Sequence, residues 1–186
     1  MRIISGSLKG KKINFIKNSN TRPLRDIVKE NIFNILSHSN IIKVKIEYSK
    51  ILDLYSGVGS FGIECISRGA KKVTFVENNY QSFNLLQNNL ANLSILEKSR
   101  VINNKIENVL VSDLNEKFNI FFLDPPYADK LFIENLKTIK KNNLFDSNHL
   151  VIIHREHKSE DDLTNIINLF FSKNYGRSKV IFGNFY

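Results

Sequence analysis

From residue 50 onward the sequence alternates between short apolar runs and longer amphipathic segments, and this alternation constrains the fold most strongly. The short apolar runs predict buried strands, and the amphipathic segments between them predict helices. Repeated strand–helix units of this kind form a mostly parallel sheet with helices on both faces. We therefore predict one doubly wound α/β domain of Rossmann-like type with a seven-stranded sheet.

The expected elements follow from these runs. Strands are expected at residues 51–56, 73–77, 99–104, 118–124 and 149–154, and two closing strands on either side of Gly176-Arg177. Helices are expected from the glycine-rich loop to about Arg68, and at 80–93, 106–114, after DPPYADK, and at 161–171.

The region before residue 50 is different in character. Residues 2–17 are predicted to form two short strands around Ser-Gly-Ser and Lys-Gly turns, so residues 1–20 form a small basic β extension. After Pro23 a helix is expected to bury Val28, Ile32, Ile35 and Leu36, while Arg25 and Lys29 lie off that stripe on its solvated side. Residues 21–186 then make up the main domain.

The loop GVGSFG, residues 57–62, directly follows the first buried strand and has the spacing G-x-G-x-x-G. Glu77 follows Gly57 by twenty residues, where a dinucleotide-binding site places its ribose-binding acid. A dinucleotide loop must hold a pyrophosphate, which a carboxylate such as Asp53 would repel. S-adenosylmethionine carries an ammonium and a sulfonium, so Asp53 favours that cofactor. A purely local capping role for Asp53 is the alternative.

A second motif, DPPY at residues 124–127, ends an apolar strand. Two consecutive prolines impose an extended, rigid turn with outward carbonyls. The Asp124 side chain and the Pro125 carbonyl would then be acceptors beside the Tyr127 ring, which suits an exocyclic base amine. An ordinary Pro-Pro turn is the structural alternative.

These residues allow methyl transfer to nitrogen. An aminopurine nitrogen is a poor nucleophile, because its lone pair is delocalised into the ring. Two acceptors that hold both N–H bonds favour a localised lone pair, which can attack the sulfonium methyl in line. Asp124 need not be a strong base, since the methylated nitrogen is acidic.

The chain resembles the RsmD-type small-subunit rRNA guanine-N2-methyltransferases, which are class I S-adenosylmethionine-dependent enzymes. The resemblance runs from MRIISGSLKGKKI through TRPLRDIVKENIFNIL, LDLYSGVGSFGIECISRGA, VTFVE and FFLDPPY to NYGRSKVIF. It implies methylation of a guanine N2 in 16S rRNA, with rRNA or an assembling 30S particle as partner.

The resemblance also implies site residues. The catalytic set is Asp124, Pro125, Pro126 and Tyr127. The expected cofactor-binding residues are Asp53, Tyr55, Gly57, Gly59, Glu77, Asn78, Asn104, Lys105 and Ile106. The expected RNA-binding residues are Arg2, Lys9, Lys11, Lys12, Arg22 and Arg25.

The chain departs from the family pattern at two places. Leu24-Arg25 follows TRP where the family has Thr and a small or acidic residue. Lys105 stands where the family has an Asp for the adenine amino group of the cofactor. Lysine accepts no hydrogen bond, so Asn104 or a backbone carbonyl is expected to substitute.

The net charge of +9 favours a polyanionic partner, although a Lys-, Asn- and Ile-rich composition of the kind that AT-rich coding produces accounts for part of it. Cys65 is the single cysteine, so no internal disulfide is possible and a reducing cytoplasm fits best. No apolar run predicts a membrane span, and the first residues do not resemble a secretory signal.

Other signals are weaker. His154-Arg-Glu-His157 is a poor metal-ligand pattern without a third ligand, and we expect a solvated or RNA-facing loop and no metal. Cys65 is expected to pack in the core, and His38 and His149 carry no evident role. The functional alternatives are another DPPY enzyme, acting on DNA adenine or cytosine or on protein glutamine, a non-catalytic rRNA-binding assembly factor, and a nicotinamide dehydrogenase.

Overall fold

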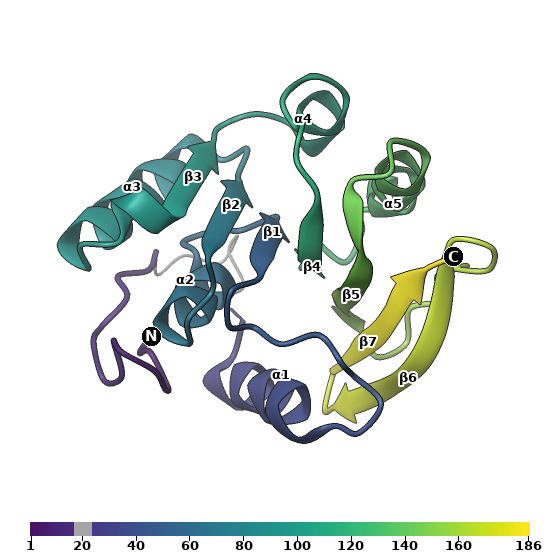
Figure 1. Ribbon diagram of the computed structural model, residues 1–186, viewed down its shortest axis with the longest axis horizontal. Coiled ribbons are helices and arrows are strands. Elements are labelled where there is room, and N and C mark those ends of the chain that lie inside the picture. The colour runs from purple at the N-terminus through teal and green to yellow at the C-terminus, as the bar shows by residue number, and fades with distance from the viewer. Residues whose placement is uncertain (17–23) are drawn as a thin grey trace.

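The computed structural model describes residues 1–16 and 24–186, and these fold around a seven-stranded sheet (Figure 1). The strand order is β3-β2-β1-β4-β5-β7-β6. Strands β1 to β5 are parallel, and β7 runs antiparallel between β5 and β6. The strands are β1 Lys50–Leu54, β2 Lys72–Val76, β3 Ser99–Ile102, β4 Phe118–Leu123, β5 Phe145–Glu156, β6 Ile167–Tyr175 and β7 Ser178–Phe185. The predicted doubly wound α/β fold is confirmed.

Helices cover both faces of this sheet. On one face lie α1 Asp26–His38, α2 Ser60–Ser67 and α3 Tyr80–Asn92, and on the other lie α4 Ile106–Ser112 and α5 Leu131–Lys141 (Figure 1). A 3₁₀ turn, η1 Leu96–Lys98, precedes β3. Because side chains alternate along a strand, Ile51 packs into the first core and its neighbour Leu52 into the second. None of the described helices has both the length and the apolar character needed to cross a membrane.

The helix predicted at residues 161–171 is wrong. Residues 164–166 form a turn, and β6 begins at Ile167 and pairs with β7 along its whole length. The apolar cluster of this segment fits either period, and β-branched and aromatic residues favour a strand once an antiparallel partner is beside it.

The two short strands predicted within residues 2–17 are reduced, in residues 1–16, to one isolated antiparallel bridge between Arg2 and Lys12. Ile3, Leu8 and Ile13 are nevertheless buried in the core shared with α1 and α2. The backbone of this segment bonds both to itself and to α2: Ile3 N donates to Lys11 O over 3.0 Å and Ile13 N to Met1 O over 2.9 Å, and Ser7 N donates to Ser67 O over 2.8 Å. Gly6, at φ +83°, lies so close to Ser67 that a Cβ would overlap its carbonyl.

Helix α1 buries most of the predicted stripe, and it also buries one residue that was expected to be solvated. Val28, Ile32 and Leu36 are buried as predicted, whereas Ile35 is only partly buried. Lys29 is wholly buried, with 0% of its surface exposed, which contradicts the prediction. Its ammonium is stabilised there by polar acceptors that the sequence does not reveal, as described below.

Candidate active site

A cavity of about 920 Å³ opens at the carboxyl edge of β1, β2 and β4. Both predicted loops line it, the glycine-rich loop through Gly57 and the tetrapeptide through Asp124 and Pro126. Parallel strands bring their carboxyl ends to one edge, so residues far apart in sequence meet there. The wall also includes Asp53, Tyr55, Ser56, Val58, Ser60, Glu77, Asn78, Asn79, Lys105, Ile106, Glu107, Asn108 and Asp129.

Glu77 fixes the glycine-rich loop. Its Oε2 accepts a hydrogen bond from Gly57 N over 2.7 Å, and its Oε1 accepts from Asn79 N, also over 2.7 Å. Burial raises the pKa of Glu77, and these backbone N–H groups oppose the rise. Gly59 has φ +85° as the N-cap of α2, and a Cβ there would overlap the Leu86 side chain. The loop therefore needs glycine at this position and the carboxylate at Glu77.

Asp53 is buried at the end of β1 and has one partner. Its Oδ2 accepts from Gly62 N over 3.0 Å, whereas Oδ1 is buried without a hydrogen-bond partner among the described residues. Burial raises the pKa of Asp53 well above its ordinary value, and the negative charges of Asp124 and Glu77 add to the rise. Asp53 thus makes the local capping bond that the sequence analysis gave as the alternative. This bond uses only Oδ2, so Oδ1 can still accept from a ligand.

The charge of this cavity discriminates between cofactors. The described residues that line the cavity include five acids but only one lysine, Lys105. A pyrophosphate would be repelled by this surface, while a ligand with an ammonium and a sulfonium would be attracted. The unpaired Asp53 Oδ1 is an acceptor of the kind that an ammonium requires. The residues present thus fit S-adenosylmethionine and do not fit a dinucleotide.

The far wall of the cavity is the start of α4. Lys105 and Ile106 line it, and so does Asn108. The Asn104 side chain is instead used locally, because its Oδ1 accepts from Lys105 N over 2.8 Å and from Asn108 Nδ2 over 3.1 Å. The contact of Asn104 or a backbone carbonyl with the adenine amino group stays a prediction.

Tyr55 closes the cavity from the β1 end. It adopts φ 60°, a left-handed conformation that is strained for an aromatic residue, and its hydroxyl accepts from Asn135 Nδ2 over 3.2 Å. Strain of this kind is concentrated at binding loops, where the surrounding contacts maintain it. Burial and the Asp129 carboxylate raise the pKa of Tyr55, so its hydroxyl stays protonated at neutral pH.

Two residues of β5 hold the DPPY tetrapeptide. His154 Nδ1 donates to Asp124 Oδ1 over 2.8 Å. Arg155 donates from Nη1 to Pro126 O and from Nη2 to Tyr127 O, both over 3.1 Å. The Asp161 carboxylate holds the guanidinium at 2.9 and 3.1 Å, and Arg155 stacks on the Phe132 ring at 4.5 Å. The DPPY turn is therefore held rigid by its two prolines and also by these contacts with His154 and Arg155.

The prediction of a solvated or RNA-facing loop for residues 154–157 is wrong for His154 and Arg155. His154 and Arg155 are buried within β5, while Glu156 and His157 are exposed. The available signal was their position directly after the apolar run LVII, which places them at the same sheet edge as Asp124. The described residues contain no group of three or more His, Cys, Asp or Glu side chains that could hold a metal. Cys65 packs in the core as predicted.

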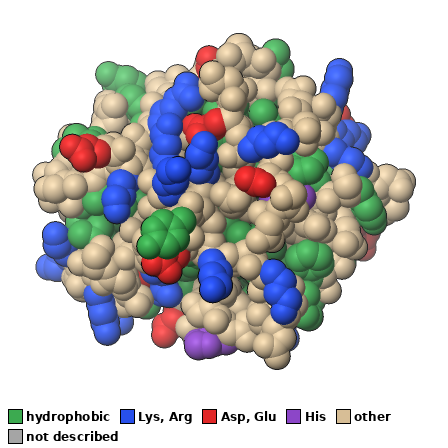
Figure 2. Space-filling model, in the orientation of Figure 1, with side chains coloured by type: hydrophobic (Ala, Val, Ile, Leu, Met, Phe, Trp, Pro, Cys, Tyr) green, Lys and Arg blue, Asp and Glu red, His purple; other side chains and the backbone are tan. Residues whose placement is uncertain are grey.

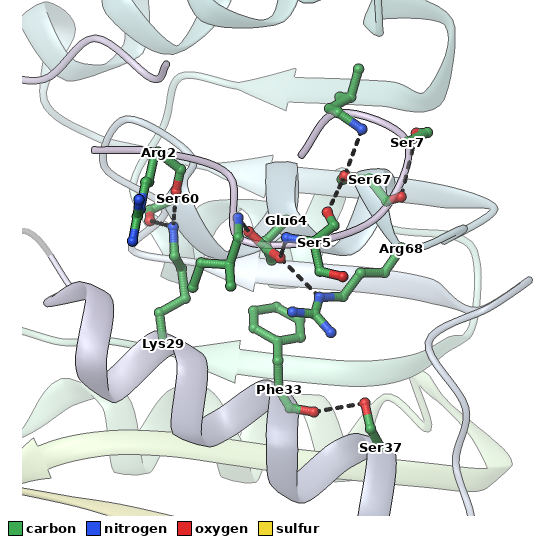
Figure 3. Close-up of polar contacts among 12 residues, drawn as sticks. Arg2, Ser5, Ser7, Lys29, Phe33, Ser37, Ser60, Glu64, Ser67 and Arg68 are labelled. Carbon is green, nitrogen blue, oxygen red and sulfur yellow. Dashed lines mark hydrogen bonds and ion pairs between the residues drawn. The ribbon is translucent and has the colours of Figure 1, made fainter. Parts of the chain in front are cut away.

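A buried polar network joins the N-terminal segment to the helix that follows the glycine-rich loop (Figure 3). Lys29 Nζ donates to Arg2 O over 2.9 Å and to Ser60 Oγ over 3.3 Å. Glu64 of α2 accepts from Ile4 N over 2.7 Å and from Ser5 N over 2.9 Å, and Arg68 donates to the same carboxylate over 2.9 Å. Burial lowers the pKa of Lys29, and Glu64 opposes that effect.

The predicted RNA-binding residues are exposed where the structure describes them. Arg2, Lys9, Lys11 and Lys12 all lie on the surface of the N-terminal segment. Arg25 is also exposed, and its Nη2 donates to Tyr175 O over 3.3 Å. Arg22 lies outside the described residues. On the face shown in Figure 2, Lys and Arg side chains are spread over the surface and do not form a single patch.

Comparison with known proteins adds to this geometry. The chain matches the family model described as Conserved hypothetical protein 95 over residues 1–184. It is 35% identical over 158 residues to Ribosomal RNA small subunit methyltransferase D of Haemophilus influenzae, covering 84% of this chain and 79% of that protein. The protein of the same name from Escherichia coli K12 is 30% identical over 156 residues, covering 84% and 75%.

Solved structures agree with the sequence relatives. The Escherichia coli protein yhhF, a candidate methyltransferase, aligns with a TM-score of 0.85 at 26% identity over 100% of this chain and 97% of that chain. The candidate methylase HI0767 of Haemophilus influenzae aligns with a TM-score of 0.78 at 30% identity, covering 100% and 98%.

Proposed function

Because this chain belongs to the Conserved hypothetical protein 95 family, the RsmD-type methyltransferases, we propose that it methylates the N2 amino group of a guanine in small-subunit rRNA. The methyl donor is S-adenosylmethionine, which supplies an electrophilic methyl on a sulfonium. The observation that carries the proposal is that the glycine-rich loop, its neighbouring acids Asp53 and Glu77, and Asp124 line one cavity.

The cofactor side of this cavity is held by its carboxylates. Asp53 Oδ1 would accept from the ammonium, since no described residue satisfies it. Glu77 would accept from the ribose hydroxyls while keeping its bonds to Gly57 N and Asn79 N, because a carboxylate has about four lone-pair sites. Tyr55, Asn78, Lys105 and Ile106 complete the wall around the adenosine portion.

The acceptor side is held by DPPY. His154 occupies Asp124 Oδ1, so Oδ2 is the oxygen that would accept from the guanine amino group. Arg155 binds the carbonyls of Pro126 and Tyr127, and the Pro125 carbonyl would accept the second amino hydrogen. Two acceptors localise the nitrogen lone pair for in-line attack, and positioning by this rigid turn supplies most of the rate enhancement.

The RNA partner would be contacted by the exposed cations of the N-terminal segment. Lys9, Lys11 and Lys12 carry positive charge without an acid among residues 1–16. Phosphate contacts of this kind position RNA without reading its sequence. The substrate is free rRNA or a partly assembled small subunit, and that substrate implies a cytoplasmic location.

The test is transfer of label from S-adenosylmethionine to unmodified small-subunit RNA and particles, followed by nucleoside identification. We expect labelled N2-methylguanosine with the native chain and a loss of at least about a hundredfold in kcat with Asp124→Ala, because an oriented acceptor is removed. His157→Ala, at an exposed position, is the matched control. Labelled adenine, cytosine or protein glutamine would contradict the proposal, and binding without transfer would indicate an assembly factor.

A further inference from the structure

A second cavity, of about 370 Å³, borders the DPPY tetrapeptide. Its wall is formed by the start of α1, by Tyr127 and His154, and by the turn that joins β6 to β7. This cavity adjoins the first one, because Asp124 lines the first, His154 lines the second, and His154 Nδ1 donates to Asp124 Oδ1 over 2.8 Å. A group bound in the second cavity would therefore lie beside the tetrapeptide that holds the target amino group.

The two cavities have opposite charge. The described residues of the first wall include five acids and one lysine. Those of the second wall include two arginines, Arg25 and Arg177, and no acid. A guanidinium binds phosphate through paired, charge-assisted hydrogen bonds, which are stronger than hydrogen bonds between neutral groups. The second cavity therefore suits an anion, whereas the first suits a cation.

Arg177 is presented by a short turn with a fixed backbone. Gly176 has φ 60°, as the first central position of a two-residue hairpin requires, and β6 and β7 pair on either side of this turn. The carbonyl of Arg177 accepts from His157 N over 2.8 Å, which attaches the turn to the end of β5. The Arg177 side chain is exposed and makes no hydrogen bond or ion pair with any other described residue. Its guanidinium is thus available to a ligand.

Arg25 reaches the same turn from α1. Its Nη2 donates to Tyr175 O over 3.3 Å, and a Cβ on Gly176 would lie 3.7 Å from that nitrogen. This single contact leaves most of the N–H donors of the exposed Arg25 guanidinium unused. Two segments that are distant in sequence therefore bring two guanidinium groups to one wall.

The position of this wall identifies the anion. A base that enters the first cavity must leave its stack, and its backbone then follows it to the protein surface. The phosphates next to that base come close to the tetrapeptide, where Arg25 and Arg177 can bind one of them. Val28 and Tyr127 add apolar and aromatic surface to the same wall, against which the adjoining ribose can pack.

We propose that Arg25 and Arg177 bind a backbone phosphate next to the target guanosine, so that the second cavity is a phosphate subsite of the active site. This inference rests on the proposed methylation of guanine N2. It adds Arg177, which was not among the expected RNA-binding residues, and it gives Arg25 a defined partner. Both residues position the nucleotide and do not contact the reacting atoms.

The test removes the charge from either partner of this contact. RNAs, assembled into particles where particles are the substrate, carry a neutral methylphosphonate at the linkage 5′ or 3′ to the modified guanosine. The nucleotide before that linkage is 2′-deoxy to prevent cleavage, and each reference RNA has the same sugar with an ordinary phosphate. We expect kcat/KM of the native protein to fall by about tenfold at one of the two linkages, because a charge-assisted contact is lost.

The double variant Arg25→Ala, Arg177→Ala should lose about tenfold or more in kcat/KM on the reference RNA. With the methylphosphonate it should lose no more than about a further twofold, because the contact is already absent. The matched double variant, Lys43→Ala and Lys141→Ala, removes the same charge at exposed positions outside both cavity walls, and it should keep the native sensitivity to the methylphosphonate. Calorimetry should show native affinity for S-adenosylmethionine in both variants, which verifies their folding. Arg177→Ala alone is the second variant should the double variant not fold.

Two results would overturn the inference. One is a native protein whose kcat/KM changes by less than about twofold with a methylphosphonate at either linkage. The other is an arginine double variant that is folded and keeps the full native sensitivity. In both cases N2-methylguanosine formation would leave the proposed function intact, whereas its absence from the native protein on unmodified RNA and particles would refute that function.

Discussion

Asp53 shows how the binding site costs stability at the scale of a single residue. The carboxylate is buried, receives one hydrogen bond from Gly62 N and lies near two other acids, so its pKa is well above the ordinary value. Between the pKa of Asp53 in the unfolded chain and its raised pKa in the folded protein, the folded protein binds more protons than the unfolded chain. Stability therefore falls as pH rises through the raised pKa of the folded state.

Asp53→Asn should accordingly stabilise the free protein and weaken cofactor binding. Above the raised pKa of Asp53 we expect a gain of about 1 kcal/mol, or roughly 2–4 °C in Tm, because the buried charge is removed while the bond from Gly62 N can persist. The gain should shrink as pH is lowered toward the range in which the native carboxyl is protonated. Thermal denaturation across pH measures it.

Calorimetric titration with S-adenosylmethionine measures the opposite effect. Loss of the anion opposite the ammonium should weaken binding by at least about tenfold, since a charge-assisted hydrogen bond is replaced by a neutral one. Glu97→Gln, at an exposed acid outside the cavity wall, is the control and should change neither quantity. Unchanged affinity in Asp53→Asn would show that Asp53 serves the Gly62 cap alone.

At the scale of elements, Glu64 attaches the N-terminal segment to α2. The carboxylate is wholly buried and accepts from Ile4 N and Ser5 N, and it pairs with Arg68 (Figure 3). Glu64→Ala leaves two N–H groups without their acceptor, at about 1–3 kcal/mol each. We expect a loss of about 3 kcal/mol in the free energy of unfolding, or roughly 6–12 °C in Tm.

Urea denaturation checks this value, and Glu30→Ala provides the matched control. Glu30 is exposed on α1, so its removal should change stability by no more than about 0.5 kcal/mol. Equal losses from the two variants would mean that the contacts between the N-terminal segment and α2 contribute little to folding.

The same elements show which parts of the fold the sequence can predict. Strands β1 to β5 were predictable, because each contains a short apolar stretch close to turn signals, although β5 begins at Phe145, before the expected range 149–154. Strand β6 was not, since the apolar cluster around Ile167 satisfies both periods and only pairing with β7 selects the strand. Lys29 was misplaced for a similar reason: its acceptors, Arg2 O and Ser60 Oγ, come from segments distant in sequence.

The candidate site divides in the same way. Asp53, Glu77 and Asp124 were predictable, because each follows or ends an apolar strand and parallel strands share an edge. His154 and Arg155 also end such a strand, and they were assigned to a loop because the tetrapeptide contacts that bury them are tertiary. Sequence motifs identify groups that contact ligands, whereas the residues that hold those groups require the fold.

At the scale of the whole molecule, the net charge of +9 does not by itself define an RNA-binding face. Basic side chains are scattered over the surface in Figure 2, so charge alone would attract RNA in many orientations. The N-terminal segment differs because its cations are exposed while Ile3, Leu8 and Ile13 fix its backbone in the core. Cations on a fixed backbone can orient a substrate toward the cavity that Met1 also lines.

Replacing Lys9, Lys11 and Lys12 together by Ala should therefore weaken RNA binding more than an equal charge change elsewhere. Each lysine that binds a phosphate releases counterions, so the slope of log affinity against log salt should decrease by about 0.7–0.9 for each lysine–phosphate pair that the substitutions remove. The matched triple variant, Lys43→Ala, Lys141→Ala and Lys173→Ala, removes the same charge at exposed positions outside this segment. Filter binding at several salt concentrations measures both variants, and calorimetry should show native affinity for S-adenosylmethionine in each. Equal salt slopes in the two triple variants would mean that the net positive charge of the whole protein attracts the RNA. The N-terminal segment would then contribute to the core and not to RNA binding.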